Sequence, residues 1–257
     1  MLLDEKQFFI TQNLDTALRH LRDETKPVTL WVDAICINQN DDSEKSCQVR
    51  NMLHVYAEAK NVMIWLGPSR GCSDKGIEAL RYLAHSTFRR PAPWLTENAD
   101  RIREGLTEVL GRVWFKRIWV VQEAAVSQKA TMICGYDSFS WTNEPVKIRR
   151  FMRMIKAAAI SPQWEFANLS RIEMDEFLQL LELQLRHIER VRRESFQKSP
   201  DILDVAYDTR HRQCTDPRDR LYAVMGLVDS ADSKMFVPDY NLPVGETFQH
   251  MLRSVEI

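Results

Sequence analysis

Two segments of this chain decide its fold, LWVDAICINQ at residues 30–39 and NVMIWLG at residues 61–67. In Val28–Ile37 both the odd and the even positions carry apolar or β-branched side chains, which is typical of a strand buried on both faces. Asn61–Gly67 has the same character. The two segments therefore predict two strands of a parallel sheet.

A helix is predicted between these strands. Asp41, followed three residues later by Glu44, is a helix-start pattern like a capping box with Asp in place of Ser or Thr. One apolar stripe then recurs at helical spacing, formed by Val49, Met52, Leu53, Tyr56 and Ala59. Strand, helix and strand together predict a βαβ unit with a right-handed crossover.

The remainder of the chain favours helices and one hairpin. Trp114–Val126 predicts a helix, and Lys129–Gly135 and Ser138–Trp141 flank a turn typical of a hairpin. Ser170–Gln197 predicts a long amphipathic helix. We therefore expect the α/β class, with an α/β part at residues 1–160 and a mostly helical C-terminal extension at residues 161–257.

Composition excludes several classes of function. The chain has 257 residues, 44% of them hydrophobic, and a formal net charge of −1, so no global charge favours nucleic acid as a partner. No window reaches the roughly 18 apolar residues of a membrane span. The five cysteines form no CxxC pair, which argues against a metal site and favours free thiols in a reducing compartment. A cytoplasmic protein is the expectation.

Three further motifs carry a resemblance to a known family. They are WFKRIWVVQE at residues 114–123, TDPRDRLYAVMGL at residues 215–227 and PDY at residues 238–240. With the segment at residues 30–67, they resemble the fungal heterokaryon-incompatibility (HET) domain and its downstream region. The resemblance implies a TIR-like or flavodoxin-like parallel sheet, and a role in self/non-self recognition and programmed cell death. It also implies regulated self-association or contact with other death-signalling proteins as the mode of action.

Glu123 is the candidate catalytic residue. A carboxylate among Trp, Val and Ile is costly to bury, so it either has a perturbed pKa at a reaction centre or pairs with Arg117 or Lys116. Trp119-x-x-x-Glu123 is similar to the Trp-Cys-x-x-Glu motif of TIR domains that hydrolyse NAD, with Val120 in place of cysteine. This resemblance implies an alternative function, NAD cleavage by Glu123, with NAD as substrate and no resident cofactor.

The candidate ligand-binding residues are Asp33, Asn38, Gln39, Arg117 and Trp119. Asp33 is expected inside a strand, while Asn38 and Gln39 follow it, and open α/β sheets bind ligands at the carboxyl edge. The alternative is that Asn38 and Gln39 satisfy loop backbone groups, that Asp41 only caps the helix, and that the tryptophans fill the core. Cys36 as a nucleophile needs a positioned histidine, which nothing in the sequence supplies.

One element of the family pattern has no counterpart in this chain. HET domains begin with a strand of the form Tyr-x-Ala-Leu-Ser-Tyr-x-Trp-Gly, which the resemblance places between the two predicted strands. We therefore expect a truncated N-terminus, another segment in the gap, or a different strand order.

Overall fold

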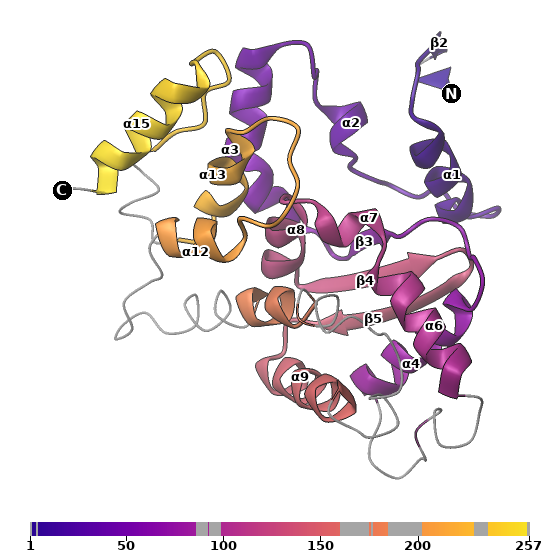
Figure 1. Ribbon diagram of the computed structural model, residues 1–257. Coiled ribbons are helices and arrows are strands. Elements are labelled where there is room, and N and C mark those ends of the chain that lie inside the picture. Colours follow the sequence, from indigo (N-terminus) through magenta and orange to yellow (C-terminus); the bar gives the residue numbers. More distant parts are fainter. Residues whose placement is uncertain are drawn as a thin grey trace.

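A three-stranded sheet forms the centre of the computed structural model, which describes residues 2–3, 5–85, 92, 99–159, 175, 177–184, 202–228 and 236–255. The strands are β3 (Val62–Trp65), β4 (Lys129–Cys134) and β5 (Asp137–Thr142), in the order β3-β4-β5 (Figure 1). The β3–β4 pair is parallel and the β4–β5 hairpin is antiparallel. The fold is therefore α/β with a mixed sheet, whereas the sequence predicted a parallel one.

The predicted strand at Val28–Ile37 is absent. Residues 28–32 are extended but unpaired, and residues 33–36 form the single-turn helix α2 (Asp33–Cys36). The Val32 carbonyl accepts hydrogen bonds from Ile35 and Cys36, so this segment satisfies its backbone locally. A strand needs a partner edge, and Val28 is 49% exposed. The prediction was wrong because β-branched composition cannot supply that edge.

Side-chain caps mark the starts of the two long N-terminal helices. A short hairpin, β1 (Leu2–Leu3) with β2 (Lys6–Gln7), precedes α1 (Gln12–Leu21), and the Thr11 hydroxyl caps α1 by accepting from the Leu14 N–H at 3.2 Å. The Asp41 carboxylate caps α3 (Asp42–Glu58) by accepting from the backbone of Ser43 and Glu44. The capping role of Asp41 is confirmed.

Three helices cover β5 and its surroundings. They are α4 (Ser73–His85), α6 (Ala99–Leu110) and α9 (Pro145–Ala159). α4 contacts α6, β5 and α9, and α9 also contacts β5. α4 and α6 cross with almost no side chain between them, because Gly76 lies against the Gly105 carbonyl and Gly105 against the Cys72 carbonyl.

The helix predicted at Trp114–Val126 is two helices, α7 (Val113–Lys116) and α8 (Val120–Val126). Arg117 is extended between them, with φ −79° and ψ 143°, and forms a parallel bridge with Gln213. The Gln213 N–H donates to the Lys116 carbonyl, and the Ile118 N–H donates to the Gln213 carbonyl. A segment about a hundred residues away thus breaks the helix, which helical periodicity alone cannot anticipate.

The C-terminal region packs on the same core as the N-terminal one. α12 (Ile202–Asp208) contacts α13 (Asp219–Met225), and α13 and α3 both contact α8. α15 (Val244–Val255) follows at the end of the chain (Figure 1). Of the predicted helix at Ser170–Gln197, residues 177–184 are helical, and the predicted boundary near residues 161–170 lies outside the described residues.

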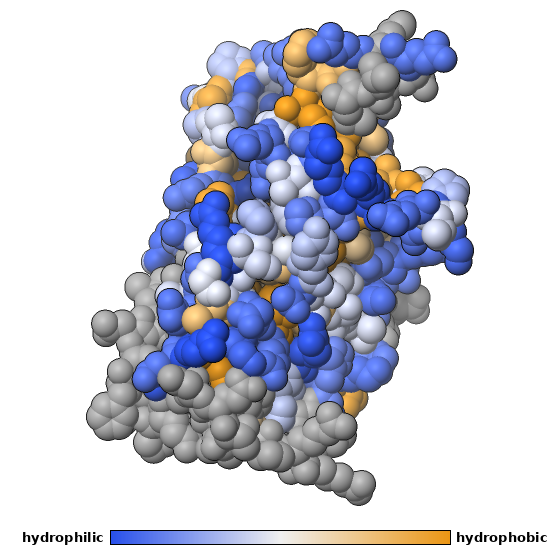
Figure 2. All heavy atoms as spheres, turned by 90° about the vertical axis from the view of Figure 1, so that its right-hand side faces the viewer, coloured by the Kyte–Doolittle hydropathy of each residue, from blue (hydrophilic) through white to orange (hydrophobic). Residues whose placement is uncertain are grey.

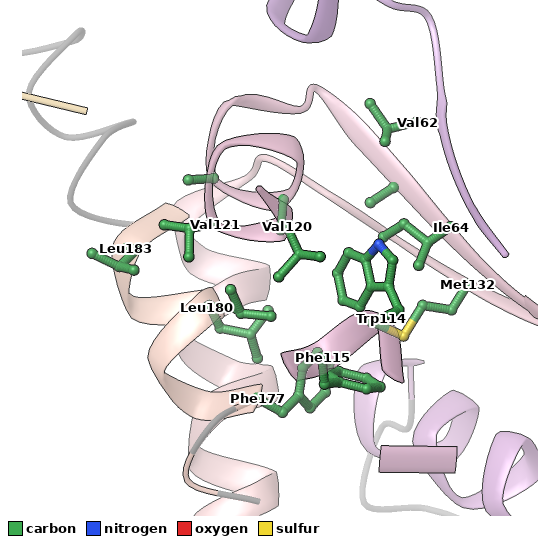
Figure 3. Close-up of a cluster of buried hydrophobic side chains, with 14 of the residues drawn as sticks. Val62, Ile64, Trp114, Phe115, Val120, Val121, Met132, Phe177, Leu180 and Leu183 are labelled. Atoms are coloured by element: carbon green, nitrogen blue, oxygen red, sulfur yellow. The ribbon is translucent and has the colours of Figure 1, made fainter. Parts of the chain in front are cut away.

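The hydrophobic core joins these elements. Figure 3 shows Val62, Ile64 and Met132 from the sheet facing Trp114, Phe115 and Val120, with side chains of residues 177–183 packed below. Phe115 and Phe177 are fully buried, with ring centroids 5.8 Å apart and planes at 83°. No helix in the described part of the chain is long and apolar enough to cross a membrane.

Candidate functional site

A cavity of about 1020 Å³ lies between α2, α3, the α7–α8 connection and the segment leading into α13. Its volume is at the upper end of the range typical of small-molecule sites, roughly 300–1,000 Å³. The side chains that line it come from both halves of the sequence: Asp33, Ile37, Gln39, Lys45, Val49, Met52, Arg117, Trp119, residues 213–219, Tyr240 and Val244.

One buried carboxylate fixes two aromatic side chains of this cavity. Asp219, at the start of α13, accepts a hydrogen bond from the Trp119 indole N–H at 3.1 Å and one from the Tyr240 hydroxyl at 2.5 Å. Burial raises the pKa of Asp219, while the hydrogen bonds from Tyr240 and Trp119 act in the opposite direction. Because both donors are committed, the two rings are held in defined orientations.

A second carboxylate of the cavity is neutralised within the protein. Asp216 accepts from the Arg218 guanidinium at 3.0 and 2.7 Å, which lowers the pKa of that carboxyl. Arg218 also donates to the carbonyls of Tyr240 and Leu242 at 2.6 and 2.7 Å. Arg218 therefore ties the chain around Tyr240 to α13. Arg220, the other arginine of the motif at residues 215–227, donates to the carbonyls of Arg210 and Arg212.

Glu123 lies in the first turn of α8 and is 9% exposed. Its carboxylate accepts a hydrogen bond from the Trp114 indole N–H at 3.0 Å, and in the described part of the chain no ion pair joins it to Arg117 or Lys116. Burial raises the pKa of Glu123, against the positive charge of Arg117 and the bond from Trp114. Glu123 is not among the residues that line the cavity. Its catalytic role stays a prediction.

Four of the five predicted ligand-binding residues line the cavity: Asp33, Gln39, Arg117 and Trp119. Asp33 is half-buried at the start of α2 and accepts from the Ala34 N–H at 2.7 Å, so its expected burial inside a strand was wrong.

Gln39 donates to the Asp33 carbonyl at 3.2 Å, which closes the loop between α2 and α3. Asn38 has a different role, because its N–H donates to Glu44 and its side-chain oxygen accepts from the Asn40 N–H. Asn38 thus supports the start of α3.

Sequence reasoning missed four side chains of this cavity: Lys45, Asp216, Asp219 and Tyr240. Asp216, Asp219 and Tyr240 belong to the TDPRD and PDY motifs, which carried the family resemblance but no ligand-binding prediction. Their spacing along the chain gives no sign that they meet Trp119 and α3. Cys36, the nucleophile considered from sequence, is exposed and does not line the cavity.

Comparison with known proteins finds a family match for the N-terminal part of the chain. Residues 1–123 match the family "Heterokaryon incompatibility protein (HET)". The chain is also 26% identical, over 291 aligned residues, to heterokaryon incompatibility protein 6, OR allele, of Neurospora crassa. That alignment covers 96% of this chain and 42% of the relative, so the chain spans less than half of the relative's length. No solved structure matches.

Proposed function

Because residues 1–123 carry a heterokaryon incompatibility (HET) domain, we propose that this protein acts in fungal self/non-self recognition and in the cell-death signalling that follows it. The similarity to the Neurospora protein supports the proposal, since the alignment extends over nearly the whole chain, beyond the HET domain itself. The TIR-like arrangement of the sheet is part of the same proposal.

The proposed mode of action is regulated self-association. The two most exposed large apolar side chains of the described residues, Tyr136 at 92% and Phe9 at 85%, support it. Tyr136 follows β4 and lies 4.9 Å from the His20 ring at the end of α1, and Phe9 lies just before α1. Figure 1 places α1 over that end of the sheet.

Figure 2 shows the face of the molecule on this side, where hydrophobic residues gather toward the upper end among hydrophilic ones. A second copy of the chain that covers Phe9 and Tyr136 removes their apolar surface from water. Each Å² of apolar area buried in this way stabilises the complex by about 25 cal/mol. We name this region, which extends along α1 from Phe9 before its first residue to His20 and Tyr136 at its last turn, the α1 end.

Induced expression in a filamentous fungus tests the proposal. We expect wild-type chain to reduce the number of viable germlings, and Phe9→Ser to restore viability at the same protein level. Val146→Ser is the matched control, because Val146 is 73% exposed but lies on α9. Normal growth with abundant folded wild-type protein would contradict the proposal.

A further inference from the structure

We propose that the cavity between α2, α3 and residues 213–219 binds a small molecule through an oxyanion group, a phosphate or a carboxylate, held by Arg117 and Lys45. This inference concerns a ligand and does not depend on self-association at the α1 end. Three observations support it. Two cations of the cavity form no ion pair with any described residue, its carboxylates have donors within the protein, and part of its lining is apolar.

Two cations of the cavity have no ion pair with any described residue. Arg117 is exposed at the wall formed by the α7–α8 connection, and its backbone, not its side chain, is bound to the Gln213 segment. Lys45 projects from the second turn of α3, with its ammonium 3.7 Å from the centroid of the Tyr240 ring. A guanidinium presents several N–H donors in a planar fork that suits phosphate and carboxylate, and an ammonium adds a compact charge.

The carboxylates on the cavity wall already have donors within the protein. Asp216 is held by Arg218, Asp219 by Trp119 and Tyr240, and one oxygen of Asp33 by the Ala34 N–H. Asp216 and Asp219 thus have side-chain donors within the protein, whereas Arg117 and Lys45 form no ion pair with a described residue. This imbalance favours an anionic ligand over a cationic one.

No described carboxylate near Arg117 forms an ion pair with its guanidinium. Glu123 lies close enough to interact with it electrostatically. In the described part of the chain, neither Glu123 nor Asp33 forms an ion pair with Arg117. The Glu123 carboxylate instead accepts a hydrogen bond from the Trp114 indole N–H, and burial raises its pKa.

Apolar side chains in the same cavity leave room for the organic part of a ligand. Ile37, Val49 and Met52 line the cavity with little exposure of their own, and the ring of Trp119 is fixed by Asp219. A cavity of about 1020 Å³ exceeds what a bare phosphate fills. The ligand class is therefore a small organic molecule that carries an oxyanion.

Thermal unfolding of the full chain tests this inference with two probes, inorganic pyrophosphate and citrate, at constant ionic strength set with sodium chloride. We expect a saturable rise in the unfolding temperature with at least one probe, since a ligand that binds only the folded state stabilises it. A response to pyrophosphate alone identifies a phosphate, and a response to citrate alone identifies a carboxylate.

Four variants decide where the anion binds. Arg117→Gln and Lys45→Gln each remove one cation of the cavity, and we expect each to weaken the apparent affinity at least about tenfold. Arg22→Gln and Lys60→Gln remove exposed charges away from the cavity, and we expect unchanged affinity. No saturable stabilisation of the wild type, or equal weakening in all four variants, would overturn the proposal.

Discussion

At the scale of single residues, Asp219 has the largest predicted effect on stability. Its carboxylate receives donors from two distant segments, the Trp119 indole and the Tyr240 hydroxyl. Asp219→Ala leaves both donors without this acceptor, and each unsatisfied buried group costs about 1–3 kcal/mol. We expect a loss of roughly 2–4 kcal/mol in the free energy of unfolding, measured by urea denaturation.

Two comparisons isolate that effect. Asp219→Asn keeps a side-chain acceptor and is expected to lose less stability than Asp219→Ala. Asp204→Ala removes an exposed carboxylate from α12 and is expected to change stability by less than about 0.5 kcal/mol. Equal effects of Asp219→Ala and Asp204→Ala would show that the carboxylate does not hold the two rings.

Glu123 predicts a pH dependence with a definite sign. Burial raises the pKa of Glu123 above its ordinary value of 4.5, so the folded state binds the proton more tightly than the unfolded state. Stability contributed by this group is therefore present at low pH and is lost as the pH rises from 4.5 through the folded pKa. Glu123→Gln removes this titration and keeps an oxygen for Trp114.

We expect the stability of Glu123→Gln relative to the wild type to increase as the pH is raised above 4.5. Chemical denaturation at several pH values measures it. Glu24→Gln is a suitable control, because Glu24 is exposed. If the difference in unfolding free energy between Glu123→Gln and the wild type stays constant with pH, the pKa of Glu123 is not raised in the folded protein.

At the scale of secondary-structure elements, the crossing of α4 and α6 depends on Gly76. A methyl group there would overlap the Gly105 backbone, which cannot move without separating the two helices. We expect Gly76→Ala to lower the free energy of unfolding by about 1–3 kcal/mol or more, the usual cost of overpacking. Denaturant titration followed by circular dichroism measures this loss.

Gly245 provides the matched control for that substitution. It is also helical, in α15, but a Cβ at this position has no atom within 4 Å. Gly245→Ala should be neutral or stabilising by up to about 1 kcal/mol, because alanine favours helix more than glycine does. If both alanine variants gain stability, the close contact between α4 and α6 does not exist.

Sequence predicted the elements that are determined locally. β3, the β4–β5 hairpin and the cap of α3 by Asp41 all follow from nearby residue patterns. It failed where a distant segment decides the outcome. Val28–Ile37 has the composition of a strand without a partner edge, and Gln213 interrupts the helix at Arg117. Four ligand-binding candidates line one cavity, but the contribution of residues 213–219 and Tyr240 arises only from folding.

At the scale of the whole molecule, the C-terminal region completes the structure around the N-terminal region that matches the HET family. The Tyr240 N–H donates to Ser46 of α3 at 2.8 Å, and buried Arg212 donates to the Phe115 carbonyl. We therefore expect a fragment of residues 1–160 to lack a cooperative thermal transition, whereas the full chain has one. Calorimetry measures it, and a cooperative transition in the fragment would show that the predicted division at residue 160 separates two independent units.

Self-association is the central claim of the account, and sedimentation velocity of the purified full chain over a wide concentration range tests it most directly. We predict that the weight-average sedimentation coefficient of the wild type and of Val146→Ser rises with concentration. Phe9→Ser should stay monomeric over the same range. A wild-type chain that remains monomeric at the highest concentration would contradict the account.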